Sequence, residues 1–385
     1  MTPETRLLFL AAGGPENNSA IRDLLAHDLD WIEVCRIADR EKAAPLLWRR
    51  IRSIAPDRVP SGAEAHLKKL ARVVDFQMVY LEQLTTRSTA ALDRAGIDYA
   101  LLKGAALGCS VYGSFVERPM IDLDMLVTSA NARGAVDALL SAGWVWRADK
   151  QLDGDFSHLH HLPALLDPNG LASLEIHTSV MPFGSPFDIA TDAVLKSCRA
   201  IPFGETMVRV PDSAFLLLHT CTHFSWAHLF RQGGWRAFRD VQRITADPAF
   251  DWERFVALAE NHHALTSCYW TFRLANQLMG VGIPDAVMSR LRPPVPGFMM
   301  RALDRHLALV LVPSGPNCPS VSLRRLMWLT AIMPRWSGHG TARPWIVLAL
   351  RPEDRPSREG RAAVTSRGSW SKYWASLLLS TPARN

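Results

Sequence analysis

The sequence predicts a fold of the α+β class, in which a small α/β core is flanked by N-terminal and C-terminal helical regions. Apolar residues recur three and four apart, as in amphipathic helices, up to about residue 95 and again from about Pro211. Between these regions, short strand-like segments alternate with helix-like ones, which is the pattern of an α/β unit. A chain of 385 residues with 48% hydrophobic residues is long enough for two or three such parts, each with its own core.

Residues 1–95 are predicted to form a helical packing region. Helices are expected over residues 22–36, 43–54 and 63–95, where the apolar spacing is helical. Ser61 and Glu64 have the spacing of a capping box for the longest of these helices, and Gly96 follows it as a C-terminal glycine would.

Residues 96–210 are predicted to form the α/β core. Strands are expected over residues 97–102, 119–127, 144–147 and 174–180, and helices over residues 105–112 and 130–142. Thr128 or Ser129 is placed to cap the second helix. Residues 149–172 are rich in loop-forming residues, and Asn169-Gly170 predicts a hairpin turn.

Residues 211–350 are predicted to form a C-terminal helical domain. Helices are expected over residues 213–229, 235–245, 252–262 and 265–279, with further helix after the proline-rich break at residues 293–296. Asp251 is placed to cap the third of these helices. Residues 351–385 form a basic tail, which we expect to be flexible.

The charge distribution slightly disfavours a large nucleic-acid groove in the body of the chain, whereas the basic tail leaves nucleic-acid binding open. The chain carries a net charge of +6, and +4 of it lies in residues 351–385, which hold seven basic and three acidic residues. The rest of the chain is therefore close to neutral. The six cysteines form no CxxC pair, no apolar run reaches about 18 residues, and no signal peptide is apparent. These features indicate a cytoplasmic protein with no membrane partner.

Two aspartates provide the clearest chemical signal in the chain. Asp122 and Asp124 fall on a predicted strand, and side chains two apart in a strand point to the same face. Ile121, Leu123 and Met125 are then expected to cover the opposite face. Two carboxylates on one rigid support are suited to a hard divalent cation such as Mg²⁺.

A third acid is expected to join this pair. Glu175 lies on the polar face of the strand predicted over residues 174–180, together with His177. Three carboxylates at one place would hold one or two Mg²⁺ ions, with water and substrate phosphates completing the coordination. His177 is then expected to face a phosphate or to neighbour the metal ligands.

A Lys-Gly turn before the aspartates is suited to phosphate binding. Lys103-Gly104 lies between a predicted strand and a predicted helix, where glycine lets a phosphate approach the backbone and the helix N-terminus offers N–H groups. The P-loop pattern is absent. Arg118, four residues before Asp122, could bind phosphate or pair with an acid.

Other reactive residues suggest weaker alternatives. His219 and His223 are one helical turn apart, a spacing that can bind zinc, but histidines in an apolar helix are more often hydrogen-bonded core groups. Cys221 could be a thiol nucleophile, but nothing in the sequence supplies the rest of such a site. His158, His160 and His161 have no assigned role.

The motifs together resemble a known family. LLKGAAL, ERPMIDLDMLV, HHLPAL and LEIHTSV resemble, in that order, the motifs of the uncharacterised nucleotidyltransferase family in the DNA polymerase beta superfamily. The resemblance covers residues 96–181 closely, and FRDVQRI and DWERF match the family's C-terminal layout more loosely. It implies a minimal nucleotidyltransferase core with a short mixed sheet. It also implies that Asp122 and Asp124 are the paired metal ligands and Glu175 the third acid, and that Lys103-Gly104-Ala105 replaces the usual Gly-Ser turn beside the nucleotide phosphates.

The expected activity follows from this resemblance. It is the transfer of a nucleoside monophosphate from an NTP, such as ATP, to an acceptor hydroxyl, with Mg²⁺ or alternatively Mn²⁺ as the cofactor. Lys103 and Arg118 would offset the charge that develops on the phosphates. The acceptor could be a protein, an RNA or a small molecule. The alternative is a non-catalytic module that binds a nucleotide or a partner on the same core.

Overall fold

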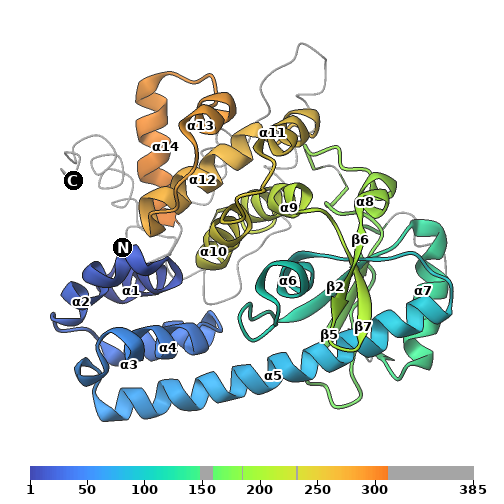
Figure 1. Ribbon diagram of the computed structural model, residues 1–385, viewed down its shortest axis with the longest axis horizontal. Helices are drawn as coiled ribbons and strands as arrows, with labels where there is room; N and C mark the ends of the chain where they lie inside the picture. Colours follow the sequence, from blue (N-terminus) through green and yellow to red (C-terminus); the bar gives the residue numbers. More distant parts are fainter. Residues whose placement is uncertain (148–158, 184, 231–232, 311–385) are drawn as a thin grey trace, which may run out of the picture.

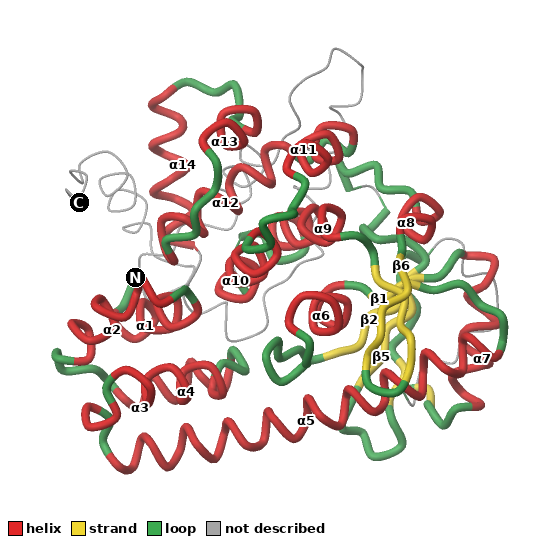
Figure 2. The backbone as a smooth tube through the Cα atoms, viewed as in Figure 1, coloured by secondary structure: helices red, strands yellow, loops and turns green. Residues whose placement is uncertain are grey.

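The computed structural model describes residues 1–147, 159–183, 185–230 and 233–310 (Figure 1). Helices surround a small sheet that lies at one end of the molecule (Figure 2). This arrangement confirms the predicted α+β class with helical flanks. The predicted basic tail over residues 351–385 lies outside the described residues, as does His158.

The main sheet has five short strands and is mixed. In spatial order they are β1 (Ala100–Leu101), β2 (Asp122–Leu126), β5 (Ser173–His177), β4 (Leu165–Leu166) and β3 (Val145–Trp146). Strands β2 and β5 are parallel, and the other neighbours are antiparallel. The register places Asp124 directly opposite Glu175. Because side chains alternate along a strand, the acids of β2 and the polar residues of β5 share one face.

Strand β2 buries its apolar side chains as predicted, with one exception. Leu123 and Met125 are fully buried on the core side of the sheet. Ile121 is 67% exposed and lines a cavity, so the prediction that it covers the apolar face is wrong. The reason is that β2 begins only at Asp122. Ile121 therefore lies outside the pleat that orients the side chains that follow it.

Two hairpins complete the β structure. The predicted turn at Asn169-Gly170 joins β4 to β5, with Gly170 at φ 67° and the Asp167 carboxylate accepting hydrogen bonds from the N–H groups of Asn169 and Ala172. A second hairpin, β6 (Arg199–Phe203) and β7 (Thr206–Val210), packs β7 against β1. The second hairpin was not predicted from the sequence.

The N-terminal region contains five α-helices among its described residues. They are α1 (Pro3–Ala12), α2 (Asn18–Leu25), α3 (Trp31–Arg40), α4 (Ala44–Ile54) and α5 (Ser61–Arg94). The single helix predicted over residues 22–36 is wrong. The Asp30 side chain starts a new helix by accepting hydrogen bonds from the N–H groups of Ile32 and Glu33.

The long helix α5 runs beneath both the N-terminal helices and the sheet (Figure 1). The capping box predicted at its start is wrong, because Pro60 occupies the N-cap position and Ser61 is already helical. Its C-terminal end is as predicted: Gly96 has a left-handed conformation, with φ 67°.

The remaining helices cover the sheet and build the C-terminal region. The α/β core contains α6 (Lys103–Leu107), which continues into the π-helical turn η3 (Gly108–Tyr112), and also α7 (Ala132–Ser141) and α8 (Thr191–Ser197). The C-terminal helices are α9 (Ser213–Trp226), α10 (Gly234–Thr245), α11 (Trp252–Asn261), α12 (Leu265–Met279), α13 (Asp285–Leu291) and α14 (Gly297–Val310). Asp251 caps α11 as predicted, by accepting from the Arg254 N–H.

The N-terminal and C-terminal helices share one hydrophobic core. Helix α1 packs against α10 and α12, and the rings of Phe9 and Phe238 lie 5.8 Å apart between their centroids. Helix α9 in turn packs against α6 of the α/β core. In the described part of the chain, no helix combines the length and apolar character needed to cross a membrane.

Candidate active site

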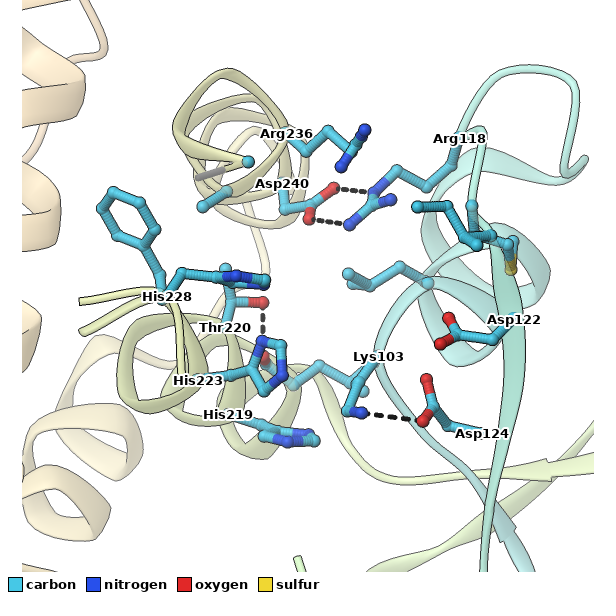
Figure 3. Close-up of a pocket in the computed structure, with 18 of the residues that line it drawn as sticks. Lys103, Arg118, Asp122, Asp124, His219, Thr220, His223, His228, Arg236 and Asp240 are labelled. Carbon is cyan, nitrogen blue, oxygen red and sulfur yellow. Dashed lines mark hydrogen bonds and ion pairs between the residues drawn. The ribbon is translucent and has the colours of Figure 1, made fainter. Parts of the chain in front are cut away.

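A cavity of about 270 Å³ lies where β2, α6, α9 and α10 meet (Figure 3). Its polar lining side chains are Lys103, Arg118, Asp122, Asp124, His219, Thr220, His223, His228, Arg236 and Asp240. Segments more than 100 residues apart in the sequence therefore form one site, with the α/β core on one side and the C-terminal helices on the other. Such a polar concave site is suited to a small ligand.

Asp124 is the most tightly held carboxylate of the cavity. It is 2% exposed, and its Oδ1 atom lies 2.7 Å from both Lys103 Nζ and His177 Nε2. Burial alone would raise the pKa of Asp124, but Lys103 and His177 outweigh burial and hold that pKa well below its usual range. Asp124 is therefore a permanent negative charge at the base of the cavity.

Glu175 and His177 extend this carboxylate site from the neighbouring strand. The Glu175 Oε2 atom lies 3.7 Å from His177 Nε2. One possible ligand atom from each of Asp124, Glu175 and His177 lies within 4.8 Å of the other two. A group of this size and composition fits a divalent cation. Neither Glu175 nor His177 lines the cavity itself, so they support Asp124 from the side.

Asp122 lies next to this group and faces the cavity (Figure 3). Burial and the negative charge of Asp124 raise the pKa of Asp122 to about 6, against the opposing effect of Lys103. Three carboxylates thus face the single ammonium of Lys103 at this end of the site. A bound divalent cation would offset the excess negative charge, and the donor set of oxygen atoms is the one that Mg²⁺ prefers.

Lys103 and Gly104 have unusual backbone and packing constraints. Lys103 has a left-handed backbone, with φ 48°, which is uncommon for a residue with a side chain and is typical of functional turns. A Cβ atom on Gly104 would lie 3.0 Å from Met120 Cβ, so even alanine is tight there. Both residues line the cavity, whereas Ala105, also predicted at the nucleotide, is buried and does not line it.

Arg118 pairs with an acid, which was one of its two expected roles. Its Nε and Nη2 atoms each lie 2.7 Å from an oxygen of Asp240 on α10, and its Nη1 donates to the Pro119 carbonyl at 3.1 Å. Tyr112 donates its hydroxyl hydrogen to the same Asp240 carboxylate. Arg118 therefore joins the segment before β2 to α10, and three of its five N–H donors are engaged in these contacts.

Arg236 is a cation of the cavity that was not predicted. Its Nη2 donates to the Glu41 carbonyl at 2.6 Å, and its buried Nε has no hydrogen-bond partner. Burial, followed by the nearby charge of Arg118, lowers the pKa of Arg236 to about 10. Arg236 and Asp240 are four apart on α10 and so share a helix face, but this spacing does not indicate that the face lines the site.

Three histidines close the side of the cavity opposite β2 (Figure 3). His219 is 2% exposed, and neither of its ring nitrogens has a hydrogen-bond partner, so the prediction of a hydrogen-bonded core group is wrong for it. Burial, followed by the charge of Lys103, lowers the pKa of His219 to about 3. Burial also lowers the pKa of His223 and that of His228, the latter to about 4. These imidazoles are therefore neutral at pH 7.

The alternative sites suggested by the sequence find little geometric support. Among the described residues, the one group with three possible metal ligands contains neither His219 nor His223. The thiol of Cys221 is fully buried and lies against Cys268. His161 forms a β-bridge with His177, and His160 packs its ring against that of His161.

A mixed sheet with paired strand carboxylates, a third acid on the parallel neighbour and a Lys-Gly turn is the arrangement that the resemblance to a nucleotidyltransferase core implied. A family model described as an uncharacterised nucleotidyltransferase matches residues 27–280. The chain therefore belongs to that family. The match spans α3 to α12, and thus includes both walls of the cavity. No curated protein and no solved structure matches the chain.

Proposed function

We propose that the protein transfers a nucleoside monophosphate from an NTP to an acceptor hydroxyl, with Mg²⁺ as the cofactor and Mn²⁺ as the alternative. The observation that carries this proposal is the register of β2 and β5. It sets Asp124 opposite Glu175, with Asp122 on the same face and beside a cavity large enough for a small ligand. Family membership supports nucleotidyl transfer in general.

Asp122, Asp124 and Glu175 are the residues that would hold the cation. When bound there, it would neutralise phosphate charge and lower the pKa of the acceptor hydroxyl. His177 holds Asp124 in place through its 2.7 Å contact and would orient that carboxylate as a neighbour of the metal ligands. We assign to Glu175, whose side chain is 27% exposed against 3% for Asp124 and 4% for His177, the role of accepting the hydroxyl proton.

The phosphate-binding part of the site would be Lys103, Gly104 and Arg236. Lys103 Nζ is paired with Asp124, and it would turn toward the phosphates once a cation shares the charge of Asp124. The unpartnered Nε of Arg236 offers a second donor from the opposite wall. Arg118 would act as a positioning residue, since its pairing with Asp240 fixes the distance between the two walls.

The test is a labelling assay with Asp122→Asn/Asp124→Asn. Wild-type protein incubated with α-labelled NTPs, Mg²⁺ and cell extract should label a discrete species. The double variant should label it about 100-fold less or worse, because several kcal/mol of transition-state stabilisation would be lost. Asp137→Asn, on the exposed face of α7, is the matched control and should label as wild type does.

Two results would contradict the proposal. Wild type that labels nothing would exclude transfer under these conditions, and equal labelling by the double variant would exclude the acids as its basis. Calorimetry then addresses the non-catalytic alternative. ATP binding that is indifferent to Mg²⁺ and to Asp122 would favour a binding module over an enzyme.

A further inference from the structure

A second cavity, of about 490 Å³, lies between α1, α4 and α10. Figure 1 shows these three helices beside one another where the N-terminal and C-terminal helical regions meet. The residues between α1 and η1 (Pro15–Asn17) and the segment that precedes β2 complete the lining. The cavity is thus assembled from three separate parts of the chain.

Four arginines line this cavity: Arg49, Arg50, Arg239 and Arg243. The carboxylate of Glu117 is the one acidic side chain of the described lining, so the lining carries a net charge of +3. Asp75 and Glu16 stand just outside it. Asp75 pairs with Arg49 at 2.7 Å, and Glu16 accepts from the Gly14 N–H. A positive charge therefore remains even when both outer acids are counted.

Two of the arginines have no carboxylate within ion-pair distance among the described residues. Arg50 donates from Nη2 to the Gly14 carbonyl, and its buried Nε has no hydrogen-bond partner. Arg243 lies over the ring of Tyr112, 5.4 Å from its centroid. Arg49 and Arg239, in contrast, both lie against Glu117. Arg50 and Arg243 are therefore the groups available to an anion.

The second cavity adjoins the candidate active site. Pro119 lines both cavities, and the residues on its N-terminal side divide between them: Glu117 faces the arginines, whereas Arg118 lines the carboxylate site. Helix α10 contributes to both as well: Arg236 and Asp240 line the first cavity, and Arg239 and Arg243, on the adjacent row of the same helix face, line the second. A ligand anchored in the second cavity would thus lie next to the site of transfer.

We propose that this arginine cavity binds the phosphate group of the acceptor, and that the acceptor is a small phosphate monoester with a free hydroxyl. This inference rests on the proposed nucleotidyl transfer. A guanidinium group matches the oxygens of a phosphate in bidentate fashion, and the two negative charges of a monoester offset the excess positive charge of the lining. The volume suits a small molecule.

The transfer step forms one bond and breaks one bond at the α-phosphorus of the NTP. The acceptor hydroxyl oxygen forms a bond to the α-phosphorus of the NTP, and the bond from that phosphorus to the bridging oxygen of the β-phosphate breaks. Pyrophosphate leaves with the bonding electron pair. The hydroxyl proton passes to the Glu175 carboxylate. The phosphate of the acceptor is unchanged and acts as the anchor.

The first experiment measures binding of inorganic phosphate to the full-length chain by ³¹P NMR line broadening, in EDTA so that no cation occupies the carboxylate site. Arg50→Met/Arg243→Met should bind at least 10-fold more weakly than wild type. Arg72→Met/Arg94→Met removes the same charge from exposed positions on α5 and should bind as wild type does. Equal binding by the cavity variant would overturn the proposal, and so would acetate that binds as tightly as phosphate.

The cavity variant could lose stability, because Arg50 also holds the Gly14 carbonyl. Arg243→Met alone avoids this problem, because the Arg243 guanidinium lies over the ring of Tyr112 and does not hold a backbone carbonyl as Arg50 does. This single variant should still weaken phosphate binding at least 3-fold. Circular dichroism of each variant provides the check on folding. A folded Arg243→Met protein with unchanged phosphate binding would also overturn the proposal.

The second experiment repeats the labelling assay with extract treated beforehand with alkaline phosphatase. Treatment should abolish labelling of a small species, and Arg50→Met/Arg243→Met should reduce that labelling at least 10-fold while ATP binding stays unchanged. A labelled protein or RNA, or labelling that survives phosphatase, would overturn the acceptor class alone. Failure of wild type to label anything would instead count against the proposed transfer, and the phosphate-binding result would still decide whether the cavity is an anion site.

Discussion

Asp122 and Asp124 lie two residues apart on one strand, yet their pKa values shift in opposite directions. Asp124 is buried and Asp122 is half-buried, and burial raises the pKa of a carboxyl group. Asp124 is in direct contact with Lys103 and His177, whereas the largest charge effect on the pKa of Asp122 comes from the carboxylate of Asp124. Asp124 is therefore a fixed negative charge, whereas Asp122 titrates near neutral pH. A bound cation would offset the negative charge of Asp124 and so favour the ionised form of Asp122.

The neutral imidazole of His219 should make the protein sensitive to acid. The pKa of His219 is about 3 in the folded state, and an unfolded histidine titrates near about 6.5. Between these values the unfolded state binds more protons, so the free energy of unfolding falls as the pH falls through this window. This one residue should contribute up to about 1.4 kcal/mol of lost stability per pH unit below about pH 6.

Urea unfolding of wild type and His219→Gln at pH 7, 6 and 5 measures this effect. The variant should lose less stability than wild type as the pH is lowered, because it has no imidazole to protonate. His66→Gln, at an exposed position on α5, is the control and should follow wild type. A constant difference between His219→Gln and wild type at all three pH values would contradict the assigned environment of His219.

The acids of the site could be predicted from the sequence. The position of Arg236 and His219 on the opposite side of the cavity could not. Asp122 and Asp124 share a face because of the period of a strand, and Glu175 follows from the same rule on its own strand. Arg236 and His219 reach the site only through packing of α9 and α10 on the core. No local pattern encodes such a contact across more than 90 residues.

Helix α10 is the element that connects the two cavities. Its residues Arg236 and Asp240 are one turn apart and face the carboxylate site, and Arg239 and Arg243, also one turn apart, face the arginine cavity. All four residues lie within about 100° of arc on one side of the helix, so two adjacent rows of the same helix face line the two cavities. The buried pair of Arg118 and Asp240 links this helix to the segment before β2.

Removing only one charge of the Arg118–Asp240 pair should lower the free energy of unfolding. Asp240→Asn leaves the buried guanidinium of Arg118 without its counter-charge, and we expect a loss of about 3–5 kcal/mol in the free energy of unfolding. Arg118→Met/Asp240→Leu removes both charges and should be less destabilised than the single variant. Glu253→Gln removes a carboxylate that is 82% exposed and should cost no more than about 1 kcal/mol.

Urea denaturation of the three variants checks this expectation. If the double variant were less stable than Asp240→Asn, the expectation would be wrong. The attraction between Arg118 and Asp240 would then stabilise the fold by more than the cost of burying an unpaired charge.

Helix boundaries could be predicted from the sequence only where a capping residue interrupts the apolar pattern. Asp251 caps α11 as expected, but the break before Asp30 was missed because apolar residues on both sides of it keep a helical spacing.

The arrangement of the whole molecule was the least predictable from sequence. The order of helices, α/β core and helices was evident, but α1 packs on α10 and α12, more than 220 residues away in the chain. Apolar periodicity identifies the face of a helix that is buried and says nothing about the partner that buries it. The division into regions 1–95, 96–210 and 211–350 therefore remains a prediction made from the sequence. We propose that the first and third of these regions fold together.

A shared core predicts that the N-terminal and C-terminal helices unfold together. Phe9 on α1 is buried against Phe238 on α10, so Phe9→Ala should remove about 3–5 kcal/mol from the stability of the joint unit. Far-UV circular dichroism and tryptophan fluorescence should give coincident urea transitions for wild type, and both should move to lower urea in the variant by the same amount. Phe76→Ala, at a side chain that is 65% exposed on α5, should leave both in place. If Phe9→Ala instead moved one transition and left a second unchanged, the N-terminal helices would be a separate unit, and the arginine cavity between α1, α4 and α10 would open independently of the carboxylate site.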